Sequence, residues 1–245
     1  MKPIRTGAVV TMAARPMLDD RALEQSEVVA NAAMNRGRRL AGVNSYSREL
    51  GFNPLDTLLQ CLEKSDTAAW LDLCCGTGQA LLQAAEQVKA DGLGHRVRLL
   101  GVDLVPMFCP APPGLEFLSL EEASLSEWRP EDRFDLITCV HGLHYVGDKL
   151  GLLGRVASWL KPDGLFLGHL DLSNVLVSEK PDNRLLLKEL RRAGFEYDGH
   201  RHLVVRRGGG DPAFPFRYTG ADDAAGPNYT GQPAVHSWYE PLASS

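Results

Sequence analysis

The 245-residue sequence has no long hydrophobic run, and this absence excludes a membrane-spanning helix. A helix needs roughly 20 apolar residues to cross a bilayer, and no stretch of the chain approaches that length. The apolar segment at residues 7–14 follows Lys2 and Arg5, as a secretory signal would, but it is short and is interrupted by Gly7 and Thr11. We therefore expect no membrane association and a cytoplasmic location.

The cysteines and histidines form none of the spacings that are typical of metal sites. Five cysteines occur without a C-x-x-C pair, and seven histidines occur without an H-E-x-x-H motif. The cysteines are Cys61, Cys74, Cys75, Cys109 and Cys139. Because neither a zinc site nor a redox dithiol is indicated, we predict free thiols in a reducing compartment and no metal cofactor.

Positive charge is also scarce, since 26 Lys and Arg residues stand against 31 Asp and Glu residues, for a net charge of −5. An acidic chain has no general electrostatic attraction to nucleic acid or to anionic membranes, so we predict neither as a partner. The apolar share of 44% is nevertheless that of a globular chain, and the length allows one or two domains.

The middle of the chain alternates between short apolar segments and helical patterns. The segments predicted as strands are 68–73, 97–102, 115–118, 134–140 and 165–170. Helical periodicity follows the first strand at 79–89 and the fourth at 149–160. Strands that are apolar throughout are buried on both faces, so we predict an α/β fold with a mostly parallel sheet between two layers of helices.

The flanks of this region have other patterns. Residues 1–19 lack periodicity and predict a loose arm, and helical spacing at 19–39 and 54–62 predicts a helical cap, with Asn53 as an N-cap. After the core, we predict a helix at 183–193.

Further on, strands at 201–206 and 214–218 are predicted to form an antiparallel hairpin, and the tail beyond Gly220 is expected to be irregular. We expect a single domain over 20–245, with the cap at 20–65, a cofactor-binding core at 66–172 and a C-terminal part at 173–245.

The turn after the first predicted strand has the composition of a ligand-binding loop. Gly76 and Gly78 permit a tight turn and a close approach of the backbone to a ligand, and a helix follows at once. Asp103 ends the second predicted strand about 25 residues later, where an acid that binds ribose hydroxyls is expected. The order of strand, glycine turn, helix, strand and acid predicts a nucleotide-bearing ligand.

The loop lacks the third glycine of a dinucleotide fingerprint and the lysine of a P-loop. Asp72 would repel a pyrophosphate but suits an ammonium group, which favours S-adenosylmethionine, whose amino-acid end is cationic. A nicotinamide-dependent oxidoreductase remains an alternative, as does a non-catalytic sensor or supporting subunit that binds the cofactor.

Four segments resemble the successive motifs of class I S-adenosylmethionine-dependent methyltransferases. They read LDLCCGTG at 71–78, LGVDL at 100–104, FDLIT at 134–138 and LKPDGL at 160–165, within a likeness that spans residues 68–170. Cys74 stands where the family usually has the first glycine of the loop. The resemblance implies a Rossmann-like sheet of seven strands, six parallel and one antiparallel, and an enzyme that leaves S-adenosylhomocysteine as product.

The resemblance also implies which residues bind the cofactor. They are Asp72, Cys74, Gly76, Thr77, Gly78, Asp103, Leu104, Glu121, Val140 and Tyr46. In this scheme Asp103 holds the ribose and Leu104 lies beside the adenine. Glu121 or Glu122 meets the adenine amino group, and Glu121 is the residue we choose. The cap tyrosine Tyr46 would lean over the donor, although it equally suits a packed helix.

Two histidines after the fourth predicted strand are the candidate catalytic residues. His141 is expected to act as a base or to orient the acceptor, and His144 is the second candidate, although both also suit a structural role. A base is needed only when the acceptor arrives protonated, as an alcohol or phenol does. Because no nucleic-acid motif is present, we predict O- or N-methylation of a small molecule.

Basic residues in the cap and aromatic residues in the tail are candidates for a part in binding the methyl acceptor. Arg36, Arg38, Arg39 and Arg48 form a basic cluster that is either a solvated helix face or an attraction for an acidic acceptor. Phe216, Tyr229, Trp238 and Tyr239 provide apolar anchors that a solvated tail would not need. We predict that the tail folds back to close the site or to form a dimer contact, so that monomer and homodimer both stay open.

Overall fold

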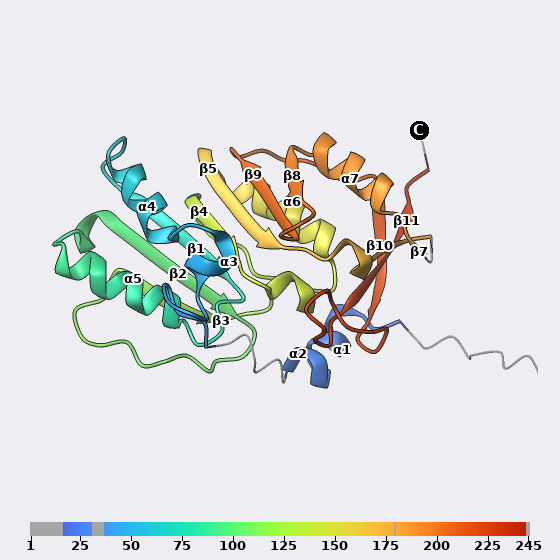
Figure 1. The fold of residues 1–245 in the computed structure, drawn as a ribbon, viewed down its shortest axis with the longest axis horizontal. Coiled ribbons are helices and arrows are strands. Elements are labelled where there is room, and N and C mark those ends of the chain that lie inside the picture. Colours follow the sequence, from blue (N-terminus) through green and yellow to red (C-terminus); the bar gives the residue numbers. More distant parts are fainter. Residues whose placement is uncertain (1–16, 31–36, 179, 244–245) are drawn as a thin grey trace, which may run out of the picture.

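The computed structural model describes residues 17–30, 37–178 and 180–243 (Figure 1). Residues 1–16 of the arm predicted at 1–19, and residues 31–36 of the first predicted cap helix with Arg36 among them, therefore lie outside the described residues. Among the residues that are described, no helix combines the length and the apolar character that a bilayer span requires.

Helices and short 3-10 turns occur on both sides of a central sheet. The helices are α1 (Asp20–Glu24), α2 (Glu27–Ala30), α3 (Tyr46–Leu50), α4 (Pro54–Leu62), α5 (Gln79–Ala90), α6 (Lys149–Trp159) and α7 (Asn183–Arg192). The 3-10 turns are η2 (Gly94–Arg96), η3 (Gly142–Tyr145) and η4 (Leu172–Asn174).

Strands make up two separate sheets. They are β1 (Ala68–Leu73), β2 (Val97–Asp103), β3 (Leu118–Glu122), β4 (Phe134–Cys139), β5 (Leu160–His169), β6 (Val175–Val177), β7 (Lys180–Pro181), β8 (Phe195–Asp198), β9 (Leu203–Arg207), β10 (Phe216–Asp222) and β11 (His236–Pro241).

The larger sheet has seven strands in the order β3-β2-β1-β4-β5-β9-β8. The five strands from β3 to β5 are parallel, whereas β9 runs antiparallel to both β5 and β8. Six strands therefore point one way and one points the other. This arrangement confirms the predicted Rossmann-like fold.

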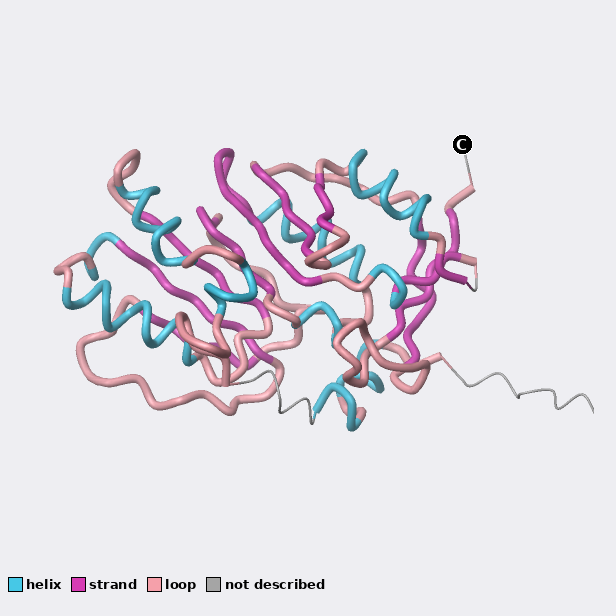
Figure 2. The backbone as a smooth tube through the Cα atoms, in the orientation of Figure 1, coloured by secondary structure: helices cyan, strands magenta, loops and turns pink. Residues whose placement is uncertain are grey.

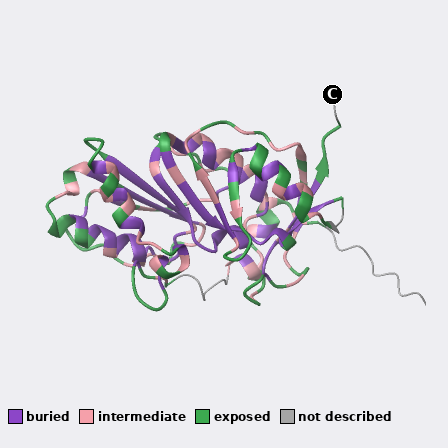
Figure 3. Ribbon diagram, turned by 45° about the horizontal axis from the view of Figure 1, so that its top comes forward, coloured by how far each residue is buried: buried purple, intermediate pink, exposed green. Residues whose placement is uncertain are grey.

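Alternate side chains of β1 enter two hydrophobic clusters, one on each face of the sheet. Trp70 packs with leucines of α4 and α5, whereas Leu71 and Leu73 pack with leucines of α6. The strands are accordingly buried and the outer helix faces are exposed (Figure 3). Burial on both faces explains why the sequence of β1 is apolar at nearly every position.

The smaller sheet, with the order β10-β11-β6-β7, was not predicted. It lies at the end of the molecule beyond β8 and α7, and Figure 2 shows its strands crossing there. The predicted hairpin between 201–206 and 214–218 is wrong, because β9 pairs with β5 and β8 while β10 pairs with β11. The alternation of apolar and polar residues indicates that a segment is a strand, but it does not indicate which other strand pairs with it.

The tail does fold back onto the core, and it is ordered by specific contacts rather than irregular. The buried Lys149 Nζ donates to the Val235 carbonyl and to Ser237 Oγ, both at 2.7 Å. Tyr239 donates its hydroxyl to Asp148 Oδ1 at 3.0 Å. These bonds attach β11 to the start of α6.

Element boundaries differ from the predictions where local signals were weak. The third strand is Leu118–Glu122 rather than 115–118, and the first cap helix is interrupted between Glu24 and Glu27. The N-cap prediction was accurate, since Asn53 Oδ1 accepts a hydrogen bond from the Leu55 amide at 3.1 Å.

Candidate active site

The glycine loop between β1 and α5 is held in an unusual backbone conformation. Cys74, Gly76 and Gly78 have φ angles of 56°, 61° and 72°, in the left-handed region that only glycine enters without strain. A Cβ on Gly78 would lie 2.7 Å from Leu120 Cδ1, so a larger residue there would require the Leu120 side chain to move. Cys74 adopts this conformation at a cost in backbone strain, and such strain is concentrated at functional sites.

Asp103, the last residue of β2, is tied directly to this loop. Its Oδ2 accepts a hydrogen bond from the Gly76 amide at 2.8 Å, and its Oδ1 accepts one from the Val105 amide at 3.1 Å. The loop and the acid therefore form one unit although the chain separates them.

A cavity opens at the carboxyl ends of β1, β2 and β4. Its wall includes six of the predicted site residues: Cys74, Gly76, Asp103, Leu104, Val140 and His141. Residues of the cap helices α1 and α2 also line it. This is the edge of an open α/β sheet at which ligands bind.

Asp72 and Tyr46 lie beneath the loop rather than in the cavity wall. The Tyr46 hydroxyl donates to Asp72 Oδ2 at 2.7 Å, and Thr138 Oγ1 donates to Asp72 Oδ1 at 2.6 Å. Burial raises the pKa of the Asp72 carboxyl to about 7, although the hydrogen bonds from Thr138 and Tyr46 act in the opposite direction. The Asp72 carboxyl group therefore links the end of β1 to Tyr46 of α3 and to Thr138 of β4.

Thr77, Gly78 and Glu121 are likewise not among the residues that line the cavity. Glu121 is exposed, and its Oε2 accepts a hydrogen bond from Trp128 Nε1 at 2.9 Å. Glu24 of α1 lines the cavity and accepts a hydrogen bond from Ser124 Oγ. The sequence analysis did not identify this residue. No local signal identified Glu24, because α1 reaches the cavity only through tertiary packing.

His141 follows β4 and forms a wall between the cavity and a second hollow. Its φ of 60° is left-handed, and its Nε2 lies 2.9 Å from Glu49 Oε2. The hydrogen bond from His141 lowers the pKa of the Glu49 carboxyl to about 2 against the effect of partial burial, and the charge of Arg38 acts in the same direction as that bond. Because the ionised Glu49 can only accept, Nε2 carries the proton and Nδ1 is the basic nitrogen.

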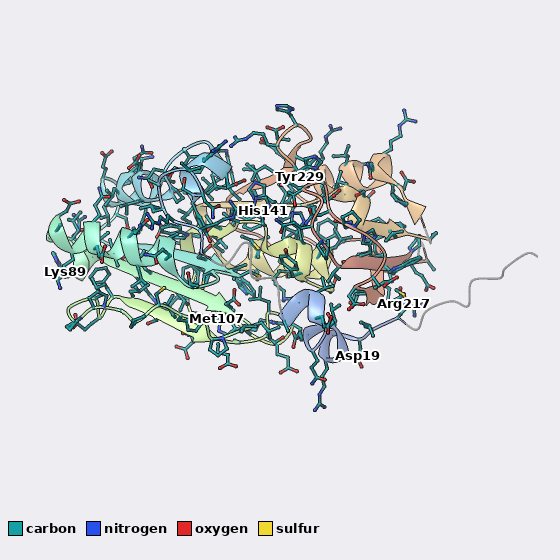
Figure 4. The ribbon with its side chains drawn as sticks, turned by 60° about the horizontal axis from the view of Figure 1, so that its bottom comes forward. Asp19, Lys89, Met107, His141, Arg217 and Tyr229 are labelled. Atoms are coloured by element: carbon teal, nitrogen blue, oxygen red, sulfur yellow. The ribbon has the colours of Figure 1, made fainter. Side chains whose placement is uncertain are left out.

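The second hollow, which we call the acceptor hollow, brings together residues from five distant segments. The residues that line it are Arg38, Arg48, Glu49, His141, His169, Arg201, Tyr229, Thr230 and Gln232. Figure 4 shows His141 and Tyr229 close together near the centre of the molecule, and their ring centroids are 6.2 Å apart. The predicted basic cluster of the cap therefore contributes Arg38 and Arg48 to a hollow that adjoins the cavity.

His169, at the end of β5, stacks on His141 with a centroid separation of 4.2 Å and an angle of 4°. Burial lowers the pKa of His169 to about 3, so its ring is neutral. A histidine at the carboxyl end of a predicted strand was a signal that could have identified it, because such strand ends meet at the site.

Glu49, His141 and His169 have ligand atoms within 4.8 Å of one another, a spacing that a metal ion could use. The parallel rings keep the nitrogen lone pairs of the two histidines in separate planes, so these lone pairs do not converge on one ion. Arg38 Nη1 also lies 2.6 Å from Glu49 Oε1 and adds a competing positive charge. The geometry suits a hydrogen-bonded network better than a metal centre.

His144, the second catalytic candidate, lies behind His141 and lines neither the cavity nor the acceptor hollow. It is buried, and among the described residues neither ring nitrogen has a hydrogen-bond partner. Burial lowers its pKa well below the usual value. Its ring packs edge-on against Tyr229, with centroids 5.4 Å apart, which favours a packing role.

Comparison with known proteins gives one family match. A family model described as a methyltransferase domain matches residues 46–208, which is more than half of the chain. Trans-aconitate 2-methyltransferase of Escherichia coli O157:H7 is 26% identical over 185 residues, which cover 75% of this chain and 57% of that protein.

The corresponding protein of Shigella flexneri is 26% identical over 175 residues, covering 71% of this chain and 54% of that protein. The chain thus spans about half the length of the curated relatives that it matches. Among solved structures, the DszA carbon methyltransferase superposes with a TM-score of 0.50 at 12% identity, covering 71% of this chain and 56% of that chain. This likeness shows the shared fold.

Proposed function

This chain belongs to the family of methyltransferase domains, and we propose that it transfers a methyl group from S-adenosylmethionine to an oxygen or nitrogen of a small molecule. The observation that carries the proposal is the position of His141. This histidine, paired with Glu49, separates a cavity built on Asp103 and the glycine loop from a second hollow. Such a wall suits a reaction between two molecules, each bound on its own side.

The cavity side has the groups that the cofactor needs. S-adenosylmethionine supplies a methyl group already activated on a sulfonium sulfur. Asp103 would accept hydrogen bonds from the ribose hydroxyls, Leu104 would pack against the adenine, and Gly76 and Cys74 would face the methionine end. The predicted contact of Glu121 with the adenine amino group stays a prediction, and Glu24 lines the cavity as another acid.

On the acceptor side, His141 would act as the general base. Its Nδ1 takes the proton from the acceptor hydroxyl or amine as the oxygen or nitrogen bonds to the methyl carbon and the carbon–sulfur bond breaks. The Glu49 carboxylate holds the ring in the required tautomer and stabilises the imidazolium that forms. Positioning of the two reactants supplies much of the remaining acceleration.

Cofactor binding and turnover can be tested separately. Calorimetry should detect S-adenosylhomocysteine binding, and this compound should raise the melting temperature whereas NAD should not. Failure to bind either the methyl donor or S-adenosylhomocysteine would refute the proposal. Binding without methylation of any member of a panel of phenols, alcohols, amines and hydroxy acids would favour the sensor alternative.

The role of His141 has its own test. His141→Ala should reduce turnover by roughly 100-fold to 10,000-fold, the usual contribution of a general base, with little change in S-adenosylhomocysteine affinity. The exposed His95 provides a matched control, since His95→Ala should change neither quantity. Full turnover by His141→Ala with the same acceptor contradicts the assigned role.

A further inference from the structure

We propose that the acceptor hollow binds the carboxylate of a small organic acid between Arg48 and Arg201, so that the methyl acceptor is itself an acid. This inference rests on the proposed function and names the substrate class of the same site. The charge of the hollow is opposite in sign to the net charge of the whole chain. Three arginines and one carboxylate define the hollow, whereas the chain as a whole has a net charge of −5.

The three arginines are not equivalent. Arg38 Nη1 is paired with the Glu49 carboxylate at 2.6 Å and also donates to Asn44 Oδ1 at 2.9 Å. Its charge is therefore balanced by Glu49, and it serves to hold that carboxylate in place for His141. The net positive charge of the hollow resides on Arg48 and Arg201.

Arg48 and Arg201 are held by neutral groups. Arg48 Nη1 donates to the Val43 carbonyl at 3.3 Å, and Arg201 Nη2 donates to the Glu49 carbonyl at 3.0 Å. Within the part of the chain that the structure describes, neither guanidinium forms an ion pair with a carboxylate. A guanidinium has five N–H donors in a planar fork, so each retains donors that match the two oxygens of a carboxylate.

Their position orients the acid toward the reacting centre. Arg48 and Arg201 are exposed, whereas His141 and His169 are buried at the base of the hollow. A carboxylate bound at the exposed arginines would leave the other end of the molecule next to His141, on the side of the cavity. Tyr229 lines the same hollow and offers an aromatic face for the part of the acid between its two ends.

A phosphate monoester is another small oxyanion, but the structure favours the carboxylate. The ionised Glu49 lies in the same hollow and would repel the second negative charge of a phosphate more strongly than the single charge of a carboxylate. The planar carboxylate also matches the planar guanidinium fork, which a tetrahedral phosphate does less well.

The test measures binding to the full chain saturated with S-adenosylhomocysteine. The probes are succinate, citrate and 3-hydroxybenzoate, together with succinamide, 3-hydroxybenzamide and 3-hydroxyphenyl phosphate. We expect calorimetry to detect at least one of the acids but neither amide. The double variant Arg48→Gln, Arg201→Gln should weaken that acid by at least about tenfold, since hydrogen bonds between charged groups are the strong ones. Its affinity for S-adenosylhomocysteine should stay within about twofold.

Two exposed arginines outside the hollow serve as matched controls. Arg98 pairs with Asp132, and Arg217 pairs with Glu240 on the smaller sheet, so Arg98→Gln and Arg217→Gln should leave acid binding unchanged. A loss of acid binding as large in these controls would show a general effect of charge and overturn the proposal.

Other outcomes also overturn it. These are binding of no acid, equal binding of acids and amides, or preference for the phosphate ester. Absence of S-adenosylhomocysteine binding to the unaltered chain is a different result, because it refutes the proposed function itself. Once a methylated acid is found, the double variant should raise its KM by about tenfold with a smaller change in kcat, as expected for lost substrate binding.

Discussion

The cofactor cavity and the acceptor hollow share His141 but are built in different ways. Apart from the cap helices that cover it, the cavity is lined by residues between Cys74 and Arg155, which lie on successive strand ends and the loops after them. The hollow is lined by residues from the cap, the ends of β4 and β5, the turn before β9 and the loop between β10 and β11. One site follows the order of the chain, and the other depends on segments that meet only after folding.

This difference indicates which part of the protein could be changed to alter specificity for the methyl acceptor. The cavity depends on backbone conformation, such as the left-handed residues of the glycine loop and the bond from the Gly76 amide to Asp103. The hollow depends on side chains such as Arg201 and Tyr229, which loops carry to a common scaffold. A change in those loops would alter the acceptor without disturbing the cofactor cavity, as is common when function is placed on a widely used fold.

The largest effect on cofactor binding is expected when the cavity alone is damaged. Asp103→Ala removes both the proposed acceptor for the ribose hydroxyls and the group that holds the Gly76 amide, so S-adenosylhomocysteine affinity should fall by about 100-fold or more. Calorimetry measures this, with Glu86→Gln at an exposed position of α5 as a control. Unchanged affinity in Asp103→Ala would mean that the cavity does not bind the cofactor in the way proposed.

A smaller effect is expected at the boundary between the two sites. Because the pKa of Glu49 is lowered to about 2, its carboxylate is charged at every working pH and accepts the hydrogen bond from His141 Nε2. Glu49→Gln should reduce kcat by roughly 30-fold, since a neutral amide oxygen stabilises the imidazolium that forms during proton transfer less than a carboxylate does. S-adenosylhomocysteine affinity should be unchanged, and an unchanged kcat would count against the dyad.

Weakening the attachment of the smaller sheet to α6 should lower the stability of the chain. Lys149→Met leaves the Val146 and Val235 carbonyls and Ser237 Oγ without their buried donor. The loss of about 1–3 kcal/mol should lower the melting temperature by about 2–10 °C, and Lys64→Met at an exposed position should not. An unchanged melting temperature in Lys149→Met would contradict this view of the tail.

Beneath the glycine loop, the expected effect is a dependence of stability on pH. Burial raises the pKa of Asp72 to about 7, so between about pH 4 and 7 the folded state retains a proton that the unfolded state releases. The free energy of unfolding should therefore fall as pH rises through this range, relative to Asp72→Asn. Denaturant titrations at several pH values measure the difference, and Asp66→Asn, at an exposed position, should show none.

The features predicted correctly depend on nearby residues. The N-cap at Asn53, the strand at Ala68–Leu73 and the placement of Asp103 at the end of β2 can all be inferred from short stretches of sequence. The features that were missed depend on distant contacts. Glu49 and His141 are 92 residues apart in the sequence. The paired strands β6 and β11 are also distant in the sequence, since α7, β8 and β9 lie between them.

The amino-acid sequence by itself determined the order of strands and helices, the Rossmann-like sheet and the loop with its acid. Each of these rests on local hydrophobic periodicity or on backbone conformations that particular residues permit. Only the tertiary structure decided the surroundings of His141, the second sheet and the positively charged hollow. The physical reason is that side chains from separate segments meet through packing, and the spacing of residues along the chain does not encode which surfaces will come into contact.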